Sequence, residues 1–332
     1  MKHVIAGLIA ASTIVVPVQA QKGSRQPLSI SASDKQQGAA ANPQLIAEFG
    51  GAYTGSQAAF VERVGKRVAV QSGLSNATGD FTVTTLNSPV ENAFAIPGGY
   101  IYITRQLLAL MNSEAELASV LGHEVGHVAA RHSSSRNTRS TIGSLLAAGA
   151  SAVTGSDVAA RVVGTGAQLY TLSYGRKQEY EADSLGVRYM TAAGYNPYAA
   201  ADILEALDAS TDLAAQAAGK SGKSLPTWAS THPNGEDRVR RATQLAQQTG
   251  KTDASPGQDT TFLRMLDGLP YGQAGERKVL RVVAVGPKDT IESLSARMAV
   301  ADFKRDRFLI LNGLAPDSPL KPGMLVKLVS AS

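Results

Sequence analysis

The stretch Ser113-Glu-Ala-Glu-Leu-Ala-Ser-Val-Leu-Gly-His-Glu-Val-Gly-His127 decides the interpretation of this 332-residue sequence. Ser113 is suited to an N-cap, and Glu116 three residues later completes a capping box. Apolar residues then recur at helical spacing, which predicts an amphipathic helix that ends near Arg131. They are Leu117, Val120, Leu121, Val125 and Val128.

This helix carries the pentad His123-Glu124-Val125-Gly126-His127. Two histidines four residues apart lie on one helical face, so both imidazoles can bind one Zn²⁺. Glu124 would lie beside the metal and act as a general base toward a zinc-activated water, then as an acid toward the leaving amine. The alternative is that the two histidines are solvated on a polar face. The capped amphipathic helix that carries them favours metal binding over this alternative.

A catalytic zinc site needs a third protein ligand, and the chain contains no cysteine. Glu179 and Asp183 are four residues apart in a second predicted helix, at about 173–193, and therefore share a face. One carboxylate can bind zinc while the other accepts a hydrogen bond from a ligating imidazole. His132 is expected to turn away from the histidine pair, and Glu181 to point elsewhere. The alternative for this acidic segment is exposure to solvent.

Several motifs, in the same order, resemble the HtpX- and BepA-like zinc metallopeptidases, which form family 48 of the metallopeptidases together with the CAAX prenyl proteases. The resemblance covers about residues 43–247. The motifs are the pentad, Arg176-Lys-Gln-Glu-Tyr-Glu-Ala-Asp-Ser-Leu-Gly186, Ser230-Thr-His-Pro233 with Arg238, and Asn92-Ala-Phe-Ala-Ile-Pro-Gly-Gly-Tyr-Ile-Tyr-Ile103. Unlike HtpX, the sequence has no multi-span membrane pattern, and unlike BepA it has no helical repeat after the catalytic part.

The resemblance implies a role for each matching residue. It makes Glu179 the third zinc ligand and Asp183 the partner of a ligating imidazole, that of His123. It places His232 on a mobile loop, where the imidazole either occupies the open position of the metal and keeps the enzyme latent, or stabilises the tetrahedral oxyanion. Arg238 either belongs to the catalytic site or orders the loop by pairing with a carboxylate.

The first 20 residues are typical of a secretory signal peptide. A basic start precedes an apolar run from Val4 to Val16, and Val18-Gln-Ala20 resembles a cleavage site. The run is short for a hydrocarbon core of ~30 Å, which favours export with cleavage near Ala20 over a membrane anchor. Residues 21–42 lack periodicity and are expected to form a flexible lead-in. These features predict a periplasmic protein.

The composition is that of an ordinary globular protein, with 43% hydrophobic and 18% charged residues. The formal net charge is +5, and the basic residues are scattered, so no nucleic-acid partner is expected. Peripheral contact with an anionic membrane surface stays open. An apolar segment at 142–169 contains Asp157 and Arg161, which favours a buried helical hairpin over a membrane span.

The C-terminal part of the sequence differs from the rest in its pattern of predicted elements. Residues 249–258 are rich in Thr, Asp, Ser, Pro and Gly and mark a linker. Residues 259–332 are predicted to form a strand, two short helices and a strand. This order, with the segments Asp289-Thr290, Leu311-Asn312-Gly313 and Lys321-Pro322-Gly323, resembles a LysM domain, although Lys288 stands where a glycine usually precedes Asp-Thr. The resemblance implies binding to peptidoglycan through glycans that contain N-acetylglucosamine. The alternative is a small packing or substrate-positioning module.

We therefore predict an α+β protein with two domains. A mainly helical, zincin-type metallopeptidase domain with a small β-sheet occupies 43–248, and a small βααβ LysM-like domain occupies 259–332. Helices are expected at 56–72, 113–131, 173–193, 197–209 and 236–248, strands at 81–86 and 100–104, and a mobile loop at 210–226.

The predicted function is that of an exported zinc metalloendopeptidase, which binds one Zn²⁺ and hydrolyses misfolded or misassembled envelope proteins. A strand at Tyr100–Ile103 could bind substrate backbone as an added β-strand, which favours unfolded segments. One alternative is a latent or non-catalytic periplasmic chaperone or adaptor tethered to peptidoglycan. Another is a cell-wall hydrolase, which the family resemblance disfavours.

Overall fold

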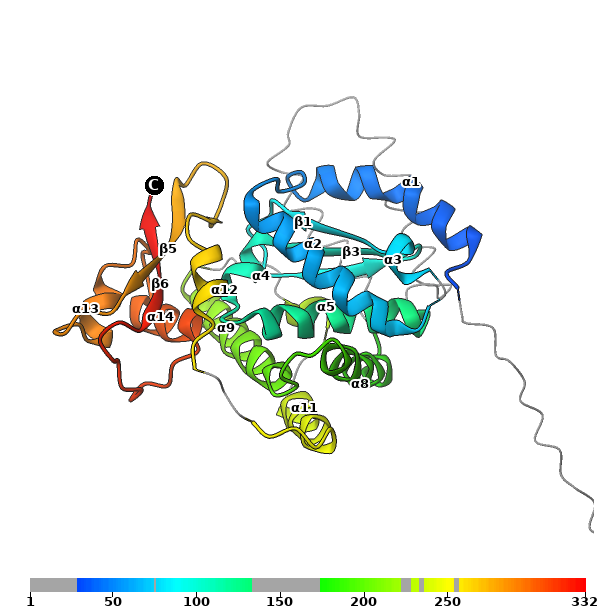
Figure 1. Cartoon of the computed structure of the whole chain (residues 1–332). Helices are drawn as coiled ribbons and strands as arrows, with labels where there is room; N and C mark the ends of the chain where they lie inside the picture. The colour runs from blue at the N-terminus through cyan, green and yellow to red at the C-terminus, as the bar shows by residue number, and fades with distance from the viewer. Residues whose placement is uncertain (1–28, 75, 133–173, 222–227, 233–235, 254–256) are drawn as a thin grey trace, which may run out of the picture.

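The computed structural model describes residues 29–74, 76–132, 174–221, 228–232, 236–253 and 257–332 (Figure 1). The predicted signal peptide and the apolar segment at 142–169 lie outside these ranges. Within the described ranges, every helix is too short or too polar to cross a bilayer.

A three-stranded sheet lies between helices. Its strands are β1 (Thr82–Leu86), β2 (Ala93–Ile96) and β3 (Tyr100–Thr104), in the order β1-β3-β2. β1 pairs with β3 in parallel, and β2 pairs with β3 antiparallel. The predicted strands at 81–86 and 100–104 are confirmed. The structure adds β2 as an edge strand, so β3, which the sequence nominates for substrate binding, is the central strand.

The two faces of the sheet bury different side chains. Tyr102 packs with Leu45 of helix α1 (Ala32–Glu48) in one apolar cluster. On the opposite face, Ile103 belongs to the main core, together with residues of α2 (Ser56–Ala69) and α5 (Glu114–Ala129). The alternation along β3 therefore places one layer of helices on each side of the sheet (Figure 1).

Helix α1 begins at Ala32, which corrects the expected flexible lead-in (21–42) over residues 32–42, while residues 21–28 lie outside the described ranges. Ser31 caps its first turn. Gly38 lets α1 lie directly on the turn between β2 and β3, where a Cβ would clash with the Pro97 carbonyl oxygen. Because small residues make this contact, the sequence shows no hydrophobic period that would predict the helix.

The other predicted helices near the sheet are confirmed. α2 continues into the 3₁₀ turn η1 (Val70–Ser72), and α11 occupies Glu236–Gln248. Ser113 caps α5 by accepting a hydrogen bond from the Glu116 N–H. The Glu116 carboxylate reaches the N–H of Asn112, one residue before the one that a capping box would use. Two short helices complete this part, α3 (Ala77–Asp80) and α4 (Arg105–Leu110).

Helices α5 (Glu114–Ala129) and α8 (Arg176–Ala192) pack at very close range. A Cβ added to Gly186 of α8 would lie 2.9 Å from the backbone nitrogen of His123 on α5. Gly126 makes the same close approach from α5. These glycines bring the side chains of the two helices together at the candidate site.

Helix α9 (Ala199–Ser221) corrects the predicted helix end near Ala209 and the part of the predicted loop at 210–221, while residues 222–226 lie outside the described ranges. Alanine, the strongest helix former, recurs through its second half. Leu213 is buried and anchors that half in the core. The short helix α10 (Trp228–Thr231) comes next among the described residues.

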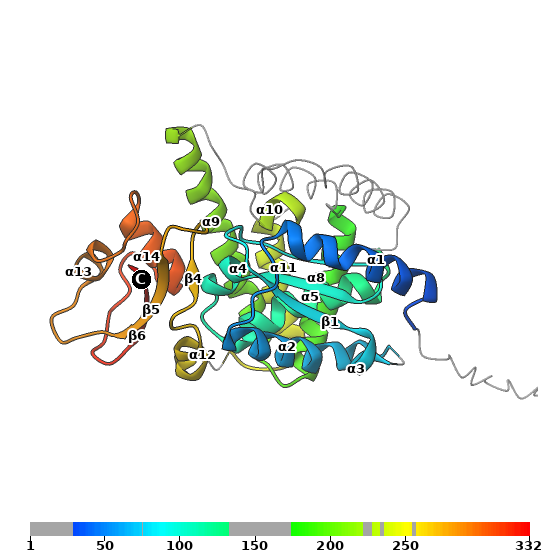
Figure 2. The same ribbon diagram turned by 90° about the horizontal axis from the view of Figure 1, so that it is seen from above.

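The C-terminal part contains the predicted order of strand, helix, helix and strand, and lies at one end of the molecule (Figure 2). The elements are α12 (Thr260–Met265), β4 (Pro270–Tyr271), β5 (Lys278–Ala284), α13 (Ile291–Ala296), α14 (Lys304–Asn312) and β6 (Leu325–Ala331). Strand β5 pairs antiparallel with both β4 and β6. Helix α12 and strand β4 precede the predicted set.

The two predicted domains share one hydrophobic core. Phe262 and Val326 belong to the same apolar cluster as the sheet and α5. Lys327 of β6 is fully buried, and its Nζ donates to the backbone oxygens of residues 109–111 at 2.6 to 3.0 Å. These oxygens lie at the end of α4, just before the turn that begins α5. The last strand of the chain thus holds the start of the histidine-bearing helix.

Candidate metal centre

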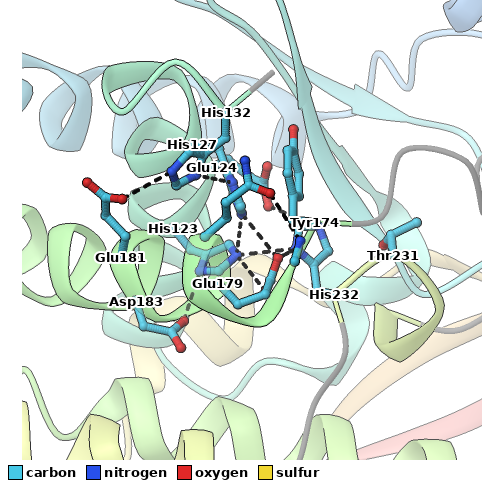
Figure 3. Close-up of polar contacts among 12 residues, drawn as sticks. His123, Glu124, His127, His132, Tyr174, Glu179, Glu181, Asp183, Thr231 and His232 are labelled. Carbon is cyan, nitrogen blue, oxygen red and sulfur yellow. Dashed lines mark hydrogen bonds and ion pairs between the residues drawn. The ribbon is translucent and has the colours of Figure 1, made fainter. Parts of the chain in front are cut away.

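Four buried side chains from three parts of the chain converge (Figure 3). His123 and His127 come from α5, Glu179 comes from α8, and His232 follows α10. One potential ligand atom of each lies within 4.8 Å of the others. The structure therefore assembles the three predicted ligands with His232.

The separations between these atoms suit a single metal ion. The Nε2 atoms of His123 and His127 are 2.9 Å apart, and His232 Nδ1 lies 3.2 Å from Glu179 Oε1. Each imidazole of the α5 pair lies 3.5 Å from a Glu179 oxygen. Ligand atoms at about 2.0–2.1 Å from a tetrahedral Zn²⁺ are about 3.3 Å from one another. Zinc prefers such nitrogen and carboxylate donors, so the residues fit it.

Glu124 is fully buried beside this group. In the described part of the chain, neither oxygen of its carboxylate has a hydrogen-bond partner. Its Oε1 lies 3.6 Å from His232 Nε2. Burial raises the pKa of Glu124, against the opposing effect of the nearby imidazoles. A carboxylate kept here without a donor fits a site that receives a cation and a proton.

Asp183 and Arg238 lie behind His123. Asp183 Oδ1 is 2.9 Å from His123 Nδ1, which places the imidazole proton on Nδ1 and leaves Nε2 to face the other ligands. Arg238 donates two hydrogen bonds to the Asp183 carboxylate, at 2.7 and 2.8 Å, and its Nη1 lies 3.0 Å from Glu179 Oε2. Two roles are expected for Arg238 from the sequence, a place in the catalytic site or pairing with a carboxylate. The structure shows the pairing with carboxylates.

The two carboxylates favour positive charge at His123, whereas burial and the His123 imidazole lower the pKa of His127. Burial by itself lowers the pKa of His123, but the hydrogen bonds and charges of Asp183 and Glu179 outweigh it and raise this pKa to about 9. Burial likewise raises the pKa of Glu179, yet the imidazoles of His232 and His123 reverse the effect and lower it. The buried carboxylates therefore stabilise a cation among the four ligand atoms.

The segment that carries His232 is held against the edge of β2. His232 Nε2 donates to the Ala93 carbonyl oxygen at 3.3 Å, so its Nδ1 faces the other ligands. Thr231 Oγ1 donates to Asn92 Oδ1 at 3.1 Å. The Trp228 ring stacks on the His232 ring, with centroids 4.1 Å apart. Backbone, side-chain and aromatic contacts together keep His232 in the site.

Three residues around His127 were not assigned from the sequence. His132 Nδ1 lies 3.0 Å from His127 Nδ1, and His132 Nε2 lies 3.3 Å from Glu181 Oε2. The Tyr174 ring stacks on His127, with centroids 3.8 Å apart. The expectation that His132 turns away from the pair is corrected here, whereas Glu181 points away from the four converging side chains and contacts only the outer nitrogen of His132. His132 returns because Arg131, at φ 60°, ends the helix, and a helix end cannot be placed to one residue from sequence.

Comparison with known proteins identifies the family that has this site. The profile of peptidase family M48 matches residues 56–246, more than half of the chain. The chain belongs to peptidase family M48. The match spans the sheet, α5, α8 and α11, and so includes every residue of the four-ligand group. The resemblance stated from the sequence motifs is confirmed. The C-terminal part lies outside the M48 match, and its likeness to a LysM domain stays a prediction.

Relatives of two kinds share the M48 region. The chain is 34% identical over 184 residues to the mitochondrial metalloendopeptidase OMA1 of Schizosaccharomyces pombe, covering 55% of this chain and 51% of that protein. It is 35% identical over 164 residues to OMA1 of Arabidopsis thaliana, covering 49% and 31%. It is 27% identical over 218 residues to the beta-barrel assembly-enhancing protease of Yersinia pestis, covering 62% and 42%. The matched region is thus about half of these relatives' length or less.

Proposed function

We propose that this protein is an exported zinc-dependent metalloendopeptidase that hydrolyses peptide bonds in misfolded or misassembled envelope proteins. The observation that carries the proposal is the buried group of His123, His127, Glu179 and His232, with the unpartnered carboxylate of Glu124 beside it. Membership of the M48 peptidases supports the same activity.

The chemistry divides between a metal and the protein. A Zn²⁺ held by His123, His127 and Glu179 would polarise the scissile carbonyl and lower the pKa of a water molecule. Glu124 would accept the proton of the attacking water and pass it to the leaving amine. Burial raises the pKa of its carboxyl group toward the range in which both transfers are efficient.

Other residues of the site orient the zinc ligands and would regulate the access of substrate. Asp183 fixes the tautomer of His123, and Arg238 neutralises Asp183 and Glu179. His232 would occupy the position that substrate needs and keep the enzyme latent. Its contact with the Ala93 oxygen supports this role, because the same oxygen lies on the free edge of β2, where a substrate strand would pair.

The substrate and the compartment are inferred from the strand edge, the names of the relatives and the N-terminal sequence. Pairing along a strand edge recognises backbone, and unfolded segments offer free backbone. The Yersinia pestis relative is named as a beta-barrel assembly-enhancing protease, which fits an envelope setting. The OMA1 relatives are named as mitochondrial, so the proposed periplasmic location rests on the signal-like N-terminus. Peptidoglycan contact through residues 259–332 remains part of the proposal.

Glu124→Gln tests the activity. The variant keeps the side-chain shape and the metal ligands but loses the base. We expect the wild type to cleave an unfolded casein-like protein, and Glu124→Gln to bind zinc equally and cleave at least about 10²-fold more slowly. Equal cleavage by both proteins, with contaminating proteases excluded, would contradict the proposal. Suppression of aggregation without cleavage in either protein would favour the chaperone or adaptor alternative.

A further inference from the structure

His127 differs from His123 in what faces its outer nitrogen. His123 Nδ1 has the Asp183 carboxylate at 2.9 Å, whereas His127 Nδ1 has a second imidazole, with His132 Nδ1 at 3.0 Å. An imidazole that binds a metal through Nε2 carries its proton on Nδ1. His127 must then donate this hydrogen bond, and His132 Nδ1 must accept it.

The next contact completes the chain of hydrogen bonds. A neutral imidazole that accepts at Nδ1 carries its own proton on Nε2. His132 Nε2 lies 3.3 Å from Glu181 Oε2, and the carboxylate can accept that proton's hydrogen bond (Figure 3). The order is His127 to His132 to Glu181. Each proton has a place with both imidazoles neutral, so the arrangement does not depend on a change of protonation.

The backbone is shaped to bring His132 back. In a continuous helix, five residues at about 100° each would turn His132 about 140° away from His127. Instead, Arg131 has φ 60°, in the left-handed region that residues other than glycine seldom adopt. The His132 side chain is buried as a result. Tyr174 stacks on the face of His127 and fixes the plane of the ring.

We propose that His132 is a positioning residue for the metal site. It holds His127 in the tautomer and orientation that direct Nε2 toward the metal, and Glu181 holds His132 in turn. This inference rests on the proposed zinc site. Hydrogen-bond partners of ligating imidazoles are worth about 10- to 100-fold in metal affinity. The Glu181 side chain is 61% exposed, so its effect is the smaller of the two.

Zinc affinity, measured by competition with a chromophoric chelator, tests the role. His132→Leu removes the acceptor, whereas His132→Asn keeps an acceptor oxygen close to the Nδ1 position. We expect His132→Leu to bind zinc about 10- to 100-fold more weakly than the wild type, and His132→Asn to recover most of the loss. Glu181→Ala should weaken binding less. Glu205→Ala, which removes an exposed carboxylate from α9, is the matched control and should leave affinity unchanged.

Two readouts separate positioning from packing. The visible spectrum of the Co²⁺-substituted protein should change in His132→Leu and return toward the wild-type spectrum in His132→Asn. The melting temperatures of the zinc-free proteins report packing alone. Because Glu181 is exposed, Glu181→Ala keeps the test available if His132→Leu fails to fold.

Zinc affinity within twofold of the wild type in His132→Leu and Glu181→Ala would overturn the inference, while the proposed function would stand. An equal loss in His132→Leu and His132→Asn would overturn the acceptor role. A wild-type protein that binds no zinc would overturn the proposed function and this inference together.

Discussion

His232 Nδ1 lies 3.3 Å from His123 Nε2, which places the His232 imidazole at the fourth corner of the ligand group. A catalytic zinc site keeps one position open for water and substrate. Here a protein side chain fills that corner, and its segment is bonded to the edge of β2. We propose that this arrangement is a closed site, in which access to the metal position depends on the withdrawal of His232.

His232→Ala should therefore raise the rate of cleavage of an unfolded casein-like substrate, because it frees the position that water and substrate need. Thr231→Val, which removes the hydroxyl contacts with Asn92 and with the Trp228 carbonyl oxygen, should change the rate in the same direction by less. Measured kcat/KM with zinc content checked decides the matter. A lower rate in His232→Ala, with zinc retained, would support an oxyanion-stabilising role instead.

Gly186→Ala should disturb the packing of α8 against α5 and, through it, the candidate metal site. Its Cβ would lie 2.9 Å from the backbone nitrogen of His123, so α5 and α8 would have to separate. We expect a loss of about 1–3 kcal/mol in the free energy of unfolding, together with weaker zinc binding. Gly219→Ala in α9 meets nothing within 4 Å and should be neutral or slightly stabilising. Thermal unfolding with and without zinc compares the two, and an undisturbed Gly186→Ala protein would rule out the close-packing account.

Arg238→Met should destabilise the zinc-free protein strongly. Arg238 is buried and pairs with the carboxylates of Asp183 and Glu179, so its removal leaves these two buried carboxylates with imidazoles as their remaining partners. Breaking a buried pair in this way costs about 3–5 kcal/mol. Arg238→Lys keeps the charge but loses the two-pronged hydrogen bond, and should cost less. Urea unfolding in the presence of a chelator measures both; a loss below about 1 kcal/mol in Arg238→Met would argue against the pairing.

The motifs near the metal could be predicted from sequence because helical spacing fixes them. The pentad and the Glu179–Asp183 pair each lie within one helix, and a spacing of four residues places their side chains on one face whatever surrounds them. The family resemblance added His232 and Arg238. Their partners, Glu179 and Asp183, are distant in sequence, so no local pattern identifies the pairing.

The parts that could not be predicted depend on distant or backbone features. Gly38 gives no hydrophobic signal for α1, because it acts by letting the helix approach Pro97. His132 joins the site only because Arg131 leaves the helical conformation. A lysine within a strand is normally expected at the surface. Lys327 is instead fully buried against the end of α4.

Lys327→Met should reveal how tightly the C-terminal part is joined to the catalytic part. The Lys327 Nζ lies within hydrogen-bonding distance of three backbone oxygens, including that of Met111, and the loss of these contacts should cost about 3 kcal/mol. Lys321→Met, at an exposed position, is the control. Urea unfolding of both variants measures the difference.

Deletion of residues 259–332 extends the same test. Because Phe262 and Val326 lie in the main core, the shortened chain should lose cooperative unfolding. A shortened chain that unfolds cooperatively at the wild-type midpoint would indicate an independent C-terminal module instead.

The zinc content of the purified protein tests the central claim most directly. Elemental analysis after dialysis against zinc-containing and then metal-free buffer should give about one Zn²⁺ per chain for the wild type. Glu179→Ala, which removes one of the three proposed zinc ligands, should give far less, and Glu205→Ala should match the wild type. A wild-type protein that retains no zinc, or a Glu179→Ala protein that retains as much as the wild type, would contradict the account.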